Sequence, residues 1–304
     1  MRFVKMHGLG NDYVYVSGFD QTLPDDADEL ADLARRVSER RFGIGSDGLI
    51  LVLPPTTDHA HVRMRMFNAD GSEGEMCGNG VRCVCKLAHD HGICDANPMK
   101  IETAAGLMVL DYQLDDAGKV DRVAVDMGKP ILEPAEVPVD VSELGPTGQP
   151  QTFMIPVTDR GQHEPSEFLT ATFVSMGNPH AVIFTPDLET LDFTRLGPRL
   201  ETHPAFPNRM NIHFVQMTAD DRARVRHWER GSGATLACGT GACAVAVAAN
   251  LTGKAGRRLI TNLPGGELEL EWRDDDHLVM TGPAVEVYRG ELTEPAVLAA
   301  RGTT

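Results

Sequence analysis

Two short cysteine turns dominate the chemistry that this sequence could perform. Cys77 is followed by Gly-Asn-Gly, and Cys238 is followed by Gly-Thr-Gly. Each turn precedes a run of helix-forming residues, so each thiol should lie at a helix N-terminus, beside unpaired backbone N–H groups and the positive end of the helix dipole. A thiol in that position is expected to have a lowered pKa, and the same N–H groups can bind a carboxylate.

The two turns also have matching surroundings. Phe67 and Trp228 each end a run that alternates apolar and basic residues. Asn68 and Glu229 stand at equal distances before their cysteines. One cysteine beside a tight turn would be interpreted more simply as a buried structural residue. The two glycines that follow each thiol cost helix stability, and packing alone is not expected to demand that cost twice, so a function is favoured.

The elements needed to position the thiols occur in the same order in both halves of the chain. Each half has a Gly-Asn turn, a helix, two strands, the cysteine turn with its helix, and further strands. This repetition predicts an α/β (α+β) fold of two pseudo-symmetric domains from internal duplication. The expected domains are 1–128 plus about 283–304, carrying Cys77, and 129–282, carrying Cys238. A last strand near 285–288 could return to the first domain.

Three other segments allow further predictions. Residues 129–166 are rich in Pro, Gly and Glu and resemble a linker that could carry a surface excursion, with one short strand near 152–157. A helix is predicted at about 188–201. The stretch Gly43-Ile-Gly-Ser-Asp-Gly48 has the form GxGxxG, but it follows a helix and precedes a strand. That order is opposite to a dinucleotide-binding turn, so turn chemistry explains it better.

Composition narrows the class of partner. The formal net charge of −16 argues against nucleic acid and anionic membrane surfaces as partners. The sequence shows neither a signal-peptide core nor an apolar run long enough to span a membrane. Its six cysteines therefore point to reduced thiols and a cytoplasmic location.

A pair of thiols from two equivalent halves suits the inversion of a stereocentre. A hydrolase, transferase or lyase needs one base, whereas inversion can use a base on one face of a carbon and an acid on the other. Helix N-termini aimed at an α-carboxylate would stabilise the charge that develops when the α-hydrogen leaves. An active site in a cleft between the two domains is therefore expected.

Several motifs together make the chain resemble the diaminopimelate epimerase family, a group of pyridoxal-independent amino-acid racemases and epimerases. They extend from residue 3 to about 250 in the family's order. The matching pieces are His7-Gly-Leu-Gly-Asn11-Asp, Phe67-Asn68-Ala-Asp-Gly-Ser, Met76-Cys77-Gly-Asn79-Gly, Gly177-Asn178-Pro-His180, Asn211, Glu229-Arg230-Gly and Ala237-Cys238-Gly-Thr240-Gly.

The resemblance implies a fold, a reaction and a set of site residues. Each domain would be a curled, mostly antiparallel sheet around a central helix. The reaction would interconvert LL- and meso-2,6-diaminopimelate, in lysine and peptidoglycan precursor synthesis, with no metal or other cofactor and usually as a homodimer. Cys77 and Cys238 would be the acid–base pair, with His180 and Glu229 tuning their pKa values. Substrate would be bound by Asn11, Asn68, Gly78, Asn79, Asn178, Asn211, Glu229, Arg230, Gly239 and Thr240.

One departure and two alternatives remain open. Some relatives carry a substrate-contacting Gln where this chain has Gly48. A proline or hydroxyproline racemase would use the same thiol pair, but it would normally have Cys-Gly-His at the first thiol, where this chain has Cys77-Gly-Asn79. A thiol redox switch, a protein of another class, would be favoured by a Cys-x-x-Cys arrangement, which is lacking here.

Overall fold

The chain folds into two compact units, which we describe from a computed structural model covering residues 1–159 and 161–292. Unit 1 comprises Met1–Val125 and the described chain from Gly282 onward, and unit 2 comprises Asp126–Thr281. Each unit has a curled, mostly antiparallel sheet and one buried helix. Residues 293–304, which the sequence assigned to the first domain, lie outside the described part.

Unit 1 is built on a sheet whose strands pair in the order β19–β1–β2–β3–β4–β6–β7–β8, with β5 on β4. The pairs β2–β3 and β4–β6 are parallel and the others are antiparallel. Its elements are β1 (Arg2–Gly8), β2 (Asn11–Ser17), α1 (Ala27–Ser38), β3 (Gly48–Leu53), β4 (Val62–Asn68), β5 (Glu73–Gly74), α2 (Gly78–Asp90), β6 (Met99–Thr103), β7 (Gly106–Leu114), β8 (Val120–Asp126) and β19 (Val285–Glu291).

Unit 2 has a sheet with strands in the order β9–β10–β11–β12–β13–β14–β16–β17–β18, with β15 on β14. The pairs β12–β13 and β14–β16 are parallel. Its elements are η1 (Val141–Glu143), β9 (Gly145–Pro146), β10 (Thr152–Val157), β11 (Glu167–Ser175), β12 (Pro179–Phe184), α3 (Phe193–Glu201), β13 (Asn211–Ala219), β14 (Arg222–Glu229), β15 (Gly233–Thr235), α4 (Gly239–Leu251), β16 (Arg258–Leu263), β17 (Gly266–Trp272) and β18 (Leu278–Pro283).

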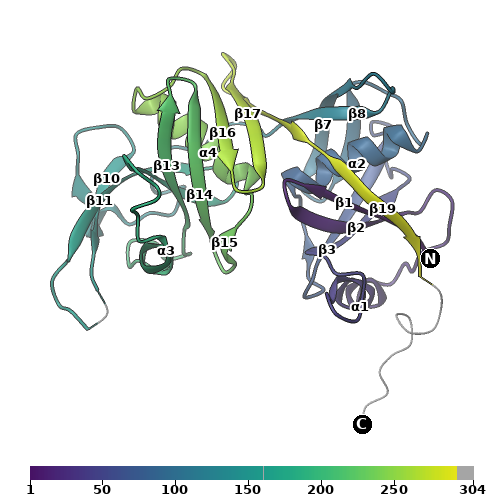
Figure 1. The fold of residues 1–304 in the computed structure, drawn as a ribbon, viewed down its shortest axis with the longest axis horizontal. Coiled ribbons are helices and arrows are strands. Elements are labelled where there is room, and N and C mark those ends of the chain that lie inside the picture. The colour runs from purple at the N-terminus through teal and green to yellow at the C-terminus, as the bar shows by residue number, and fades with distance from the viewer. Residues whose placement is uncertain (160, 293–304) are drawn as a thin grey trace, which may run out of the picture. The chain divides into compact units, whose positions relative to one another are not determined.

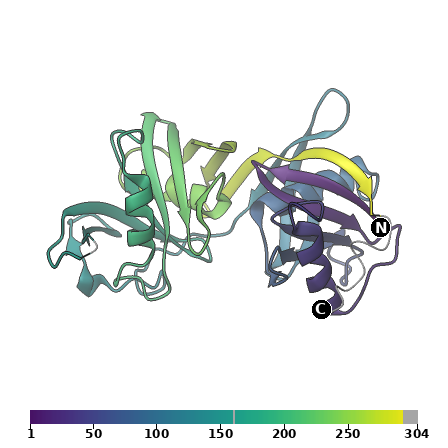
Figure 2. The ribbon, with the colours of Figure 1, turned by 60° about the horizontal axis from the view of Figure 1, so that its bottom comes forward.

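The two pairing patterns are the same, which confirms the predicted duplication. Strands β1 to β8 of unit 1 pair with one another as β11 to β18 of unit 2 do, including the two parallel pairs. Only the outer partner of the first strand differs. In unit 2, β10 pairs with β11, whereas in unit 1 that position is filled by β19, which runs beside β1 in Figures 1 and 2.

The helices differ in how completely they are buried. In α4 nearly every residue is buried, as expected for a helix that is apolar on all sides and enclosed by its sheet. In α2 the side chain of Arg82 is fully buried, and it donates to Gly78 O, Asn79 Oδ1 and Pro283 O. No helix in the described residues is long and apolar enough to cross a membrane.

Helix α1 has acidic residues in its first turn and basic residues in its last turn. Asp26 caps its N-terminus by accepting from Asp28 N and Glu29 N. The GxGxxG stretch packs against its C-terminal end, where Gly43 N donates to Glu39 O and Gly45 adopts a positive φ of 81°. This supports the interpretation of that stretch as a turn.

Two predictions about unit 2 need correction. Helix α3 begins at Phe193 and not near 188, because Asp192 caps it by accepting from Arg195 N at 3.3 Å. The 129–166 segment does contain the strand at Thr152–Val157, but it is more than a surface linker. Val137 and Val139, which lie outside that strand, belong to the buried core around α3, so the segment contributes to packing.

Candidate active site

Cys77 is the N-cap residue of α2, in the position that the Cys-Gly-x-Gly turn predicts. Its extended backbone precedes the helix, and Gly80 N donates to Cys77 Sγ at 3.4 Å. The thiol donates in turn to Asn11 Oδ1 at 3.3 Å. The half-buried sulfur thus lies between a helix N-terminus and an amide oxygen.

Asn11 is held in one orientation by a carboxylate. Its Nδ2 donates to Asp47 Oδ2 at 2.9 Å, and Asp47 is itself paired with Arg40 at 2.9 Å. Because a carboxylate only accepts, this bond directs Asn11 Oδ1 toward the thiol. Asn79 also donates to Asn11 Oδ1, at 3.5 Å. The structure therefore brings three predicted residues of unit 1 together: Asn11, Cys77 and Asn79.

Sequence reasoning missed Tyr13, which lies beside this cluster. Its side chain is buried, and its hydroxyl is within hydrogen-bonding reach of Asn11 and the Cys77 thiol. Burial raises the pKa of Tyr13, and the nearby Cys77 raises it further, so the hydroxyl stays protonated. The sequence did contain a signal for Tyr13. Tyr13 is two residues after Asn11 on the same strand, and alternate residues of a strand lie on the same face.

Gly48 makes room for the Tyr13 ring. A Cβ at Gly48 would lie 2.8 Å from Tyr13 Cε1 and would also meet the backbone of Phe67. Tyr13, Gly48 and Asn68 are partners in one row across β2, β3 and β4. Asn68 lies at the far side of this row and donates from Nδ2 to Ser72 Oγ at 2.9 Å. The Tyr13 ring thus occupies space that a side chain at position 48 would need.

Cys238 is the N-cap residue of α4 in unit 2, but its surroundings differ from those of Cys77. It is 5% exposed, lies 3.7 Å from Thr240 Oγ1 and is in hydrogen-bonding contact with Glu229. Burial raises its pKa well above the usual value, and the charge of Glu229 raises it further. The expected lowering of this pKa is therefore wrong for the free protein, because burial beside a carboxylate outweighs the helix dipole.

Glu229 ends β14 and shares this enclosed position. Its Oε1 accepts from Thr235 Oγ1, and burial raises the pKa of its carboxyl. The hydrogen bond with the Cys238 thiol lowers the pKa of Glu229, whereas the charge of Glu229 raises the pKa of Cys238, so a neutral thiol beside a carboxylate is favoured over two negative charges. Glu229 is therefore an ionisable group that contacts the Cys238 thiol directly.

The other predicted residues of unit 2 form a second hydrogen-bonded group. Asn211 donates to Pro179 O at 2.8 Å and accepts from Arg230 N at 2.9 Å, so it ties the Gly-Asn-Pro-His turn to the end of β14. The exposed Arg230 side chain donates to Asn208 O. His180 is fully buried and contacts Asn178 and His213.

Packing bears on the second glycine after each thiol. A Cβ at Gly80 would lie 2.8 Å from Ile50 Cδ1, and one at Gly241 would overlap the ring of His213. The expectation that packing alone would not demand these glycines is therefore wrong at Gly241, where the clash is with a ring, whereas the atom nearest to a Cβ at Gly80 is the end of the Ile50 side chain. Burial also raises the pKa of Cys83 to about 11 and that of Cys85 to about 12, as suits core residues.

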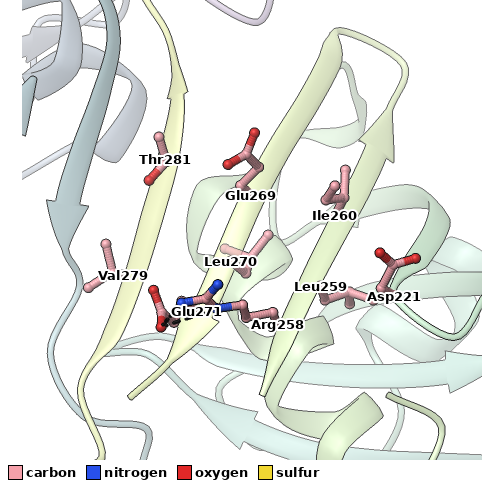
Figure 3. A pocket seen from close by; sticks show the side chains of 9 residues that line it. All are labelled: Asp221, Arg258, Leu259, Ile260, Glu269, Leu270, Glu271, Val279 and Thr281. Atoms are coloured by element: carbon pink, nitrogen blue, oxygen red, sulfur yellow. Dashed lines mark hydrogen bonds and ion pairs between the residues drawn. The ribbon is translucent and has the colours of Figure 1, made fainter. Parts of the chain in front are cut away.

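A separate hollow lies on unit 2, away from these side chains. It has a volume of about 290 Å³, and Figure 3 shows it on β16, β17 and β18, with Arg258 beside Glu271. No candidate residue lines it.

Within the described residues, no group of three or more His, Cys, Asp or Glu side chains is placed to hold a metal ion.

Comparison with known proteins identifies relatives along nearly the whole chain. The family model for diaminopimelate epimerase matches residues 3–133 and 172–287. A diaminopimelate epimerase of Desulfovibrio desulfuricans is 52% identical over 293 residues, which is 96% of this chain and 98% of that protein. One from Desulforudis audaxviator is 50% identical over 292 residues, covering 96% of this chain and 99% of that protein.

Solved structures with the same fold are more distant in sequence. A probable proline racemase from Agrobacterium radiobacter has a TM-score of 0.64 at 19% identity, covering 96% of this chain and 92% of that one. A phenazine biosynthesis protein of the PhzF family from Bacillus anthracis has a TM-score of 0.63 at 16% identity, covering 97% and 99%. These likenesses confirm the mixed α/β fold.

Proposed function

This chain belongs to the diaminopimelate epimerase family, and from that membership we propose that it interconverts LL-2,6-diaminopimelate and meso-2,6-diaminopimelate. The reaction inverts one carbon that carries an amino group, a carboxylate and a hydrogen. It would serve lysine and peptidoglycan precursor synthesis, as the resemblance implies. No metal or pyridoxal phosphate is assigned to it, because the chain's own thiols and helix ends can supply the groups that inversion needs.

Cys77 and Cys238 are proposed as the acid–base pair. One observation carries this assignment: the thiols cap α2 and α4 at the same point of a strand pattern that the two units share. One thiolate takes the α-hydrogen as a proton, and the electron pair stays on the substrate carbon and its carboxylate. The other thiol then delivers its proton to the opposite face. The two sulfurs exchange protonation states, so the reverse reaction uses them in the opposite roles.

The helix ends would stabilise the intermediate charge. The N-terminal N–H groups of a helix have no intrahelical partner, and in α2 and α4 these groups belong to Gly78, Asn79, Gly239 and Thr240. A substrate carboxylate bound there would have donors in place before its charge increases. The substrate's other charged groups are assigned to side chains that can match ammonium and carboxylate groups, namely Asn11, Asn68, Asn178, Asn211, Glu229 and Arg230.

Isotope incorporation tests the two-base reaction. In deuterated water, LL-diaminopimelate should give meso product that carries deuterium at once, while recovered substrate stays unlabelled at low conversion. The acid thiol exchanges with solvent before binding, whereas the base holds the substrate hydrogen. Early labelling of unreacted substrate would indicate a single exchanging base. L-proline, run in parallel, should not be racemised, and turnover of proline alone would overturn the substrate assignment.

Matched variants connect this reaction to the two thiols. Cys77→Ala and Cys238→Ala should each reduce turnover by about 10³-fold or more, because each removes the proton carrier on one face. Cys94→Ala is the control, because Cys94 is a half-buried thiol outside the proposed site. Turnover within a few-fold of wild type in either of the first two variants would refute the pair.

We also propose that the protein works as a homodimer in the cytoplasm. The dimer is supported by the family resemblance. The location is supported by six free cysteines, which suit a reducing compartment. Light scattering on the eluting protein should give the mass of two chains, and a single-chain mass at micromolar concentration would contradict the dimer.

A further inference from the structure

Three buried histidines form a continuous hydrogen-bonded row across neighbouring strands of unit 2. His180 of β12 lies with its Nδ1 2.8 Å from Nε2 of His213 in β13, and His213 Nδ1 lies 2.6 Å from Nδ1 of His227 in β14. At the other end, His180 Nε2 lies 2.9 Å from Asn178 Oδ1. The exposed fractions of the three residues are 0%, 0% and 1%. The row therefore runs from a candidate substrate-binding side chain into the core.

The row lies beneath the first turn of α4. The ring of His213 packs so closely under Gly241 that a side chain at this glycine would overlap it. Both nitrogens of His213 are used by the other two histidines, so the three rings form a chain and do not converge on a point where a metal ion could sit. The arrangement is suited to hydrogen bonding between neutral rings.

Burial keeps these rings neutral. It lowers the pKa of His180 and of His227 to about 3 and that of His213 well below its usual value. A neutral imidazole has one N–H donor and one nitrogen lone pair. Each contact in the row needs one of each, so fixing the tautomer of one ring fixes those of the other two. Only two proton arrangements satisfy every contact.

The amide of Asn178 selects between the two arrangements. Its Oδ1 accepts, so His180 carries its proton on Nε2, His213 on Nε2 and His227 on Nδ1. His227 Nε2 is then left as a buried lone pair, and it has no hydrogen-bond partner among the described residues. The reverse arrangement would leave a buried N–H there without an acceptor, and orphaned N–H groups are rarer in proteins than under-satisfied acceptors.

We propose that this row is a positioning device for Asn178, and that His213 and His227 are positioning residues of the active site. With its oxygen held by His180, the planar amide must turn its NH2 group the other way. Two N–H donors are thereby presented to an anionic group. This step rests on the proposed function, in which that group is a carboxylate of the substrate. The two histidines act through His180 and do not touch the substrate themselves.

The proton arrangement can be measured on the free protein without any substrate. Long-range proton–nitrogen NMR of the imidazole rings distinguishes the two tautomers of a neutral histidine. The expected pattern has Nε2–H at His180 and His213 and the less common Nδ1–H at His227, unchanged at pH 6 to 8. The reverse pattern, or rings that titrate singly in that range, would overturn the proposal whether or not the protein is an epimerase.

Kinetics of two His213 variants test the consequence for substrate. His213→Leu keeps bulk but breaks the row, so the Asn178 amide can turn and KM for diaminopimelate should rise about tenfold with little change in kcat. His213→Gln carries one donor and one acceptor and should restore KM to within about threefold of wild type. A purely packing role predicts that Leu is tolerated at least as well as Gln, and that result would overturn the proposal.

The two sets of outcomes separate this proposal from the proposed function. Wild-type protein that epimerises diaminopimelate but shows the reverse tautomers retains its function and refutes the positioning row. Wild-type protein that shows the expected tautomers but does not turn over diaminopimelate refutes the substrate assignment and, with it, the carboxylate role of Asn178. The expected tautomers, together with a higher KM in His213→Leu than in His213→Gln, support both the positioning role and the proposed function.

Discussion

The two candidate thiols have unlike neighbours even though they occupy matching places in the chain. Cys77 donates to a neutral amide oxygen, while Cys238 lies against a carboxylate in an enclosed position. A thiolate at Cys238 is therefore disfavoured in the free protein, by burial first and by Glu229 second. The resting states of the two sulfurs should differ, which gives a direct chemical prediction.

Alkylation should distinguish the two sulfurs. With iodoacetamide at pH 8, Cys77 should be modified before Cys238, because the reagent attacks only the thiolate and Cys238 is both buried and raised in pKa. In Glu229→Gln the charge that raises the pKa of Cys238 is gone, so its modification should become several-fold faster. Peptide mapping over time measures both rates.

The buried Cys83 serves as the internal control for alkylation. Its pKa is raised to about 11 by burial, and not by Glu229, so its modification should stay slow in both proteins. Equal rates for Cys77 and Cys238 in the wild type would contradict the asymmetry. An unchanged Cys238 rate in the Gln variant would show that Glu229 does not influence the thiol.

At the scale of single residues, the sequence identified the two thiols but not the pKa of Cys238. Cys77, Cys238 and their matched surroundings could be predicted, because motif and spacing are local properties. Tyr13 was missed although its spacing from Asn11 indicated a shared strand face. The histidine row could not be predicted, since its contacts depend on strand register and on which face each strand buries. The raised pKa of Cys238 could not be predicted either, because it arises from enclosure by distant parts of the chain.

The elements that carry the thiols depend on close helix-to-sheet packing. α4 approaches β13 at Gly241, where the ring of His213 occupies the space of a side chain. Gly241→Ala should therefore destabilise the fold by about 1–3 kcal/mol, because overpacking outweighs the better helix propensity of alanine. The midpoint of thermal unfolding should fall by several degrees.

Gly256→Ala is the matched control for this substitution. A Cβ at Gly256 meets no atom within 4 Å, and its backbone is not in the left-handed region. It should leave stability within about 0.5 kcal/mol of wild type. If Gly241→Ala were as harmless as Gly256→Ala, the close approach of α4 to β13 would be in error. Rescue by adding His213→Ala would identify the clashing partner.

Element boundaries show where sequence patterns stop being informative. The strands and the two cysteine helices were predicted because alternation and helix-former runs are strong there. The start of α3 was not, because Leu188 and its neighbours have suitable composition while the cap at Asp192 decides where the helix begins. The burial of Val137 and Val139 was missed because the Pro- and Gly-rich stretch around them has no periodicity.

At the scale of the whole molecule, β19 closes unit 1 from the far end of the chain. Besides pairing with β1, it is tied to the end of α2 by Glu286, which lies 2.8 Å from His91 Nε2 and is also bonded to Arg289. Burial raises the pKa of Glu286, but Arg289 and His91 lower it more, so the net pKa lies below the usual value.

This carboxylate should contribute stability that depends on pH. A group whose folded pKa is lowered stabilises the fold above its unfolded pKa, near 4.5 here, and the contribution is lost as pH falls through the folded value. Glu286→Gln should therefore lower the free energy of unfolding by about 0.5–1 kcal/mol at pH 7. The difference should shrink toward zero below about pH 4.

The exposed Glu291 on the same strand provides the control. Glu291→Gln removes the same charge from β19 without touching His91 or Arg289, and urea unfolding at pH 7 should show little change. A loss in Glu286→Gln that persists undiminished at pH 3 would mean that the effect is packing and not charge.

The position of β19 also determines when the sheet of unit 1 can be completed during translation. Strand β1 is made before unit 2, yet its outer neighbour β19 is made after all of unit 2. Unit 2 has no such delay, since β10 precedes β11 directly. While translation continues, the nascent chain therefore holds β1 with an open edge, a state in which strands pair with wrong partners. The time for which β1 keeps this open edge is therefore set by how long unit 2 takes to be synthesised, because β19 is made only after it.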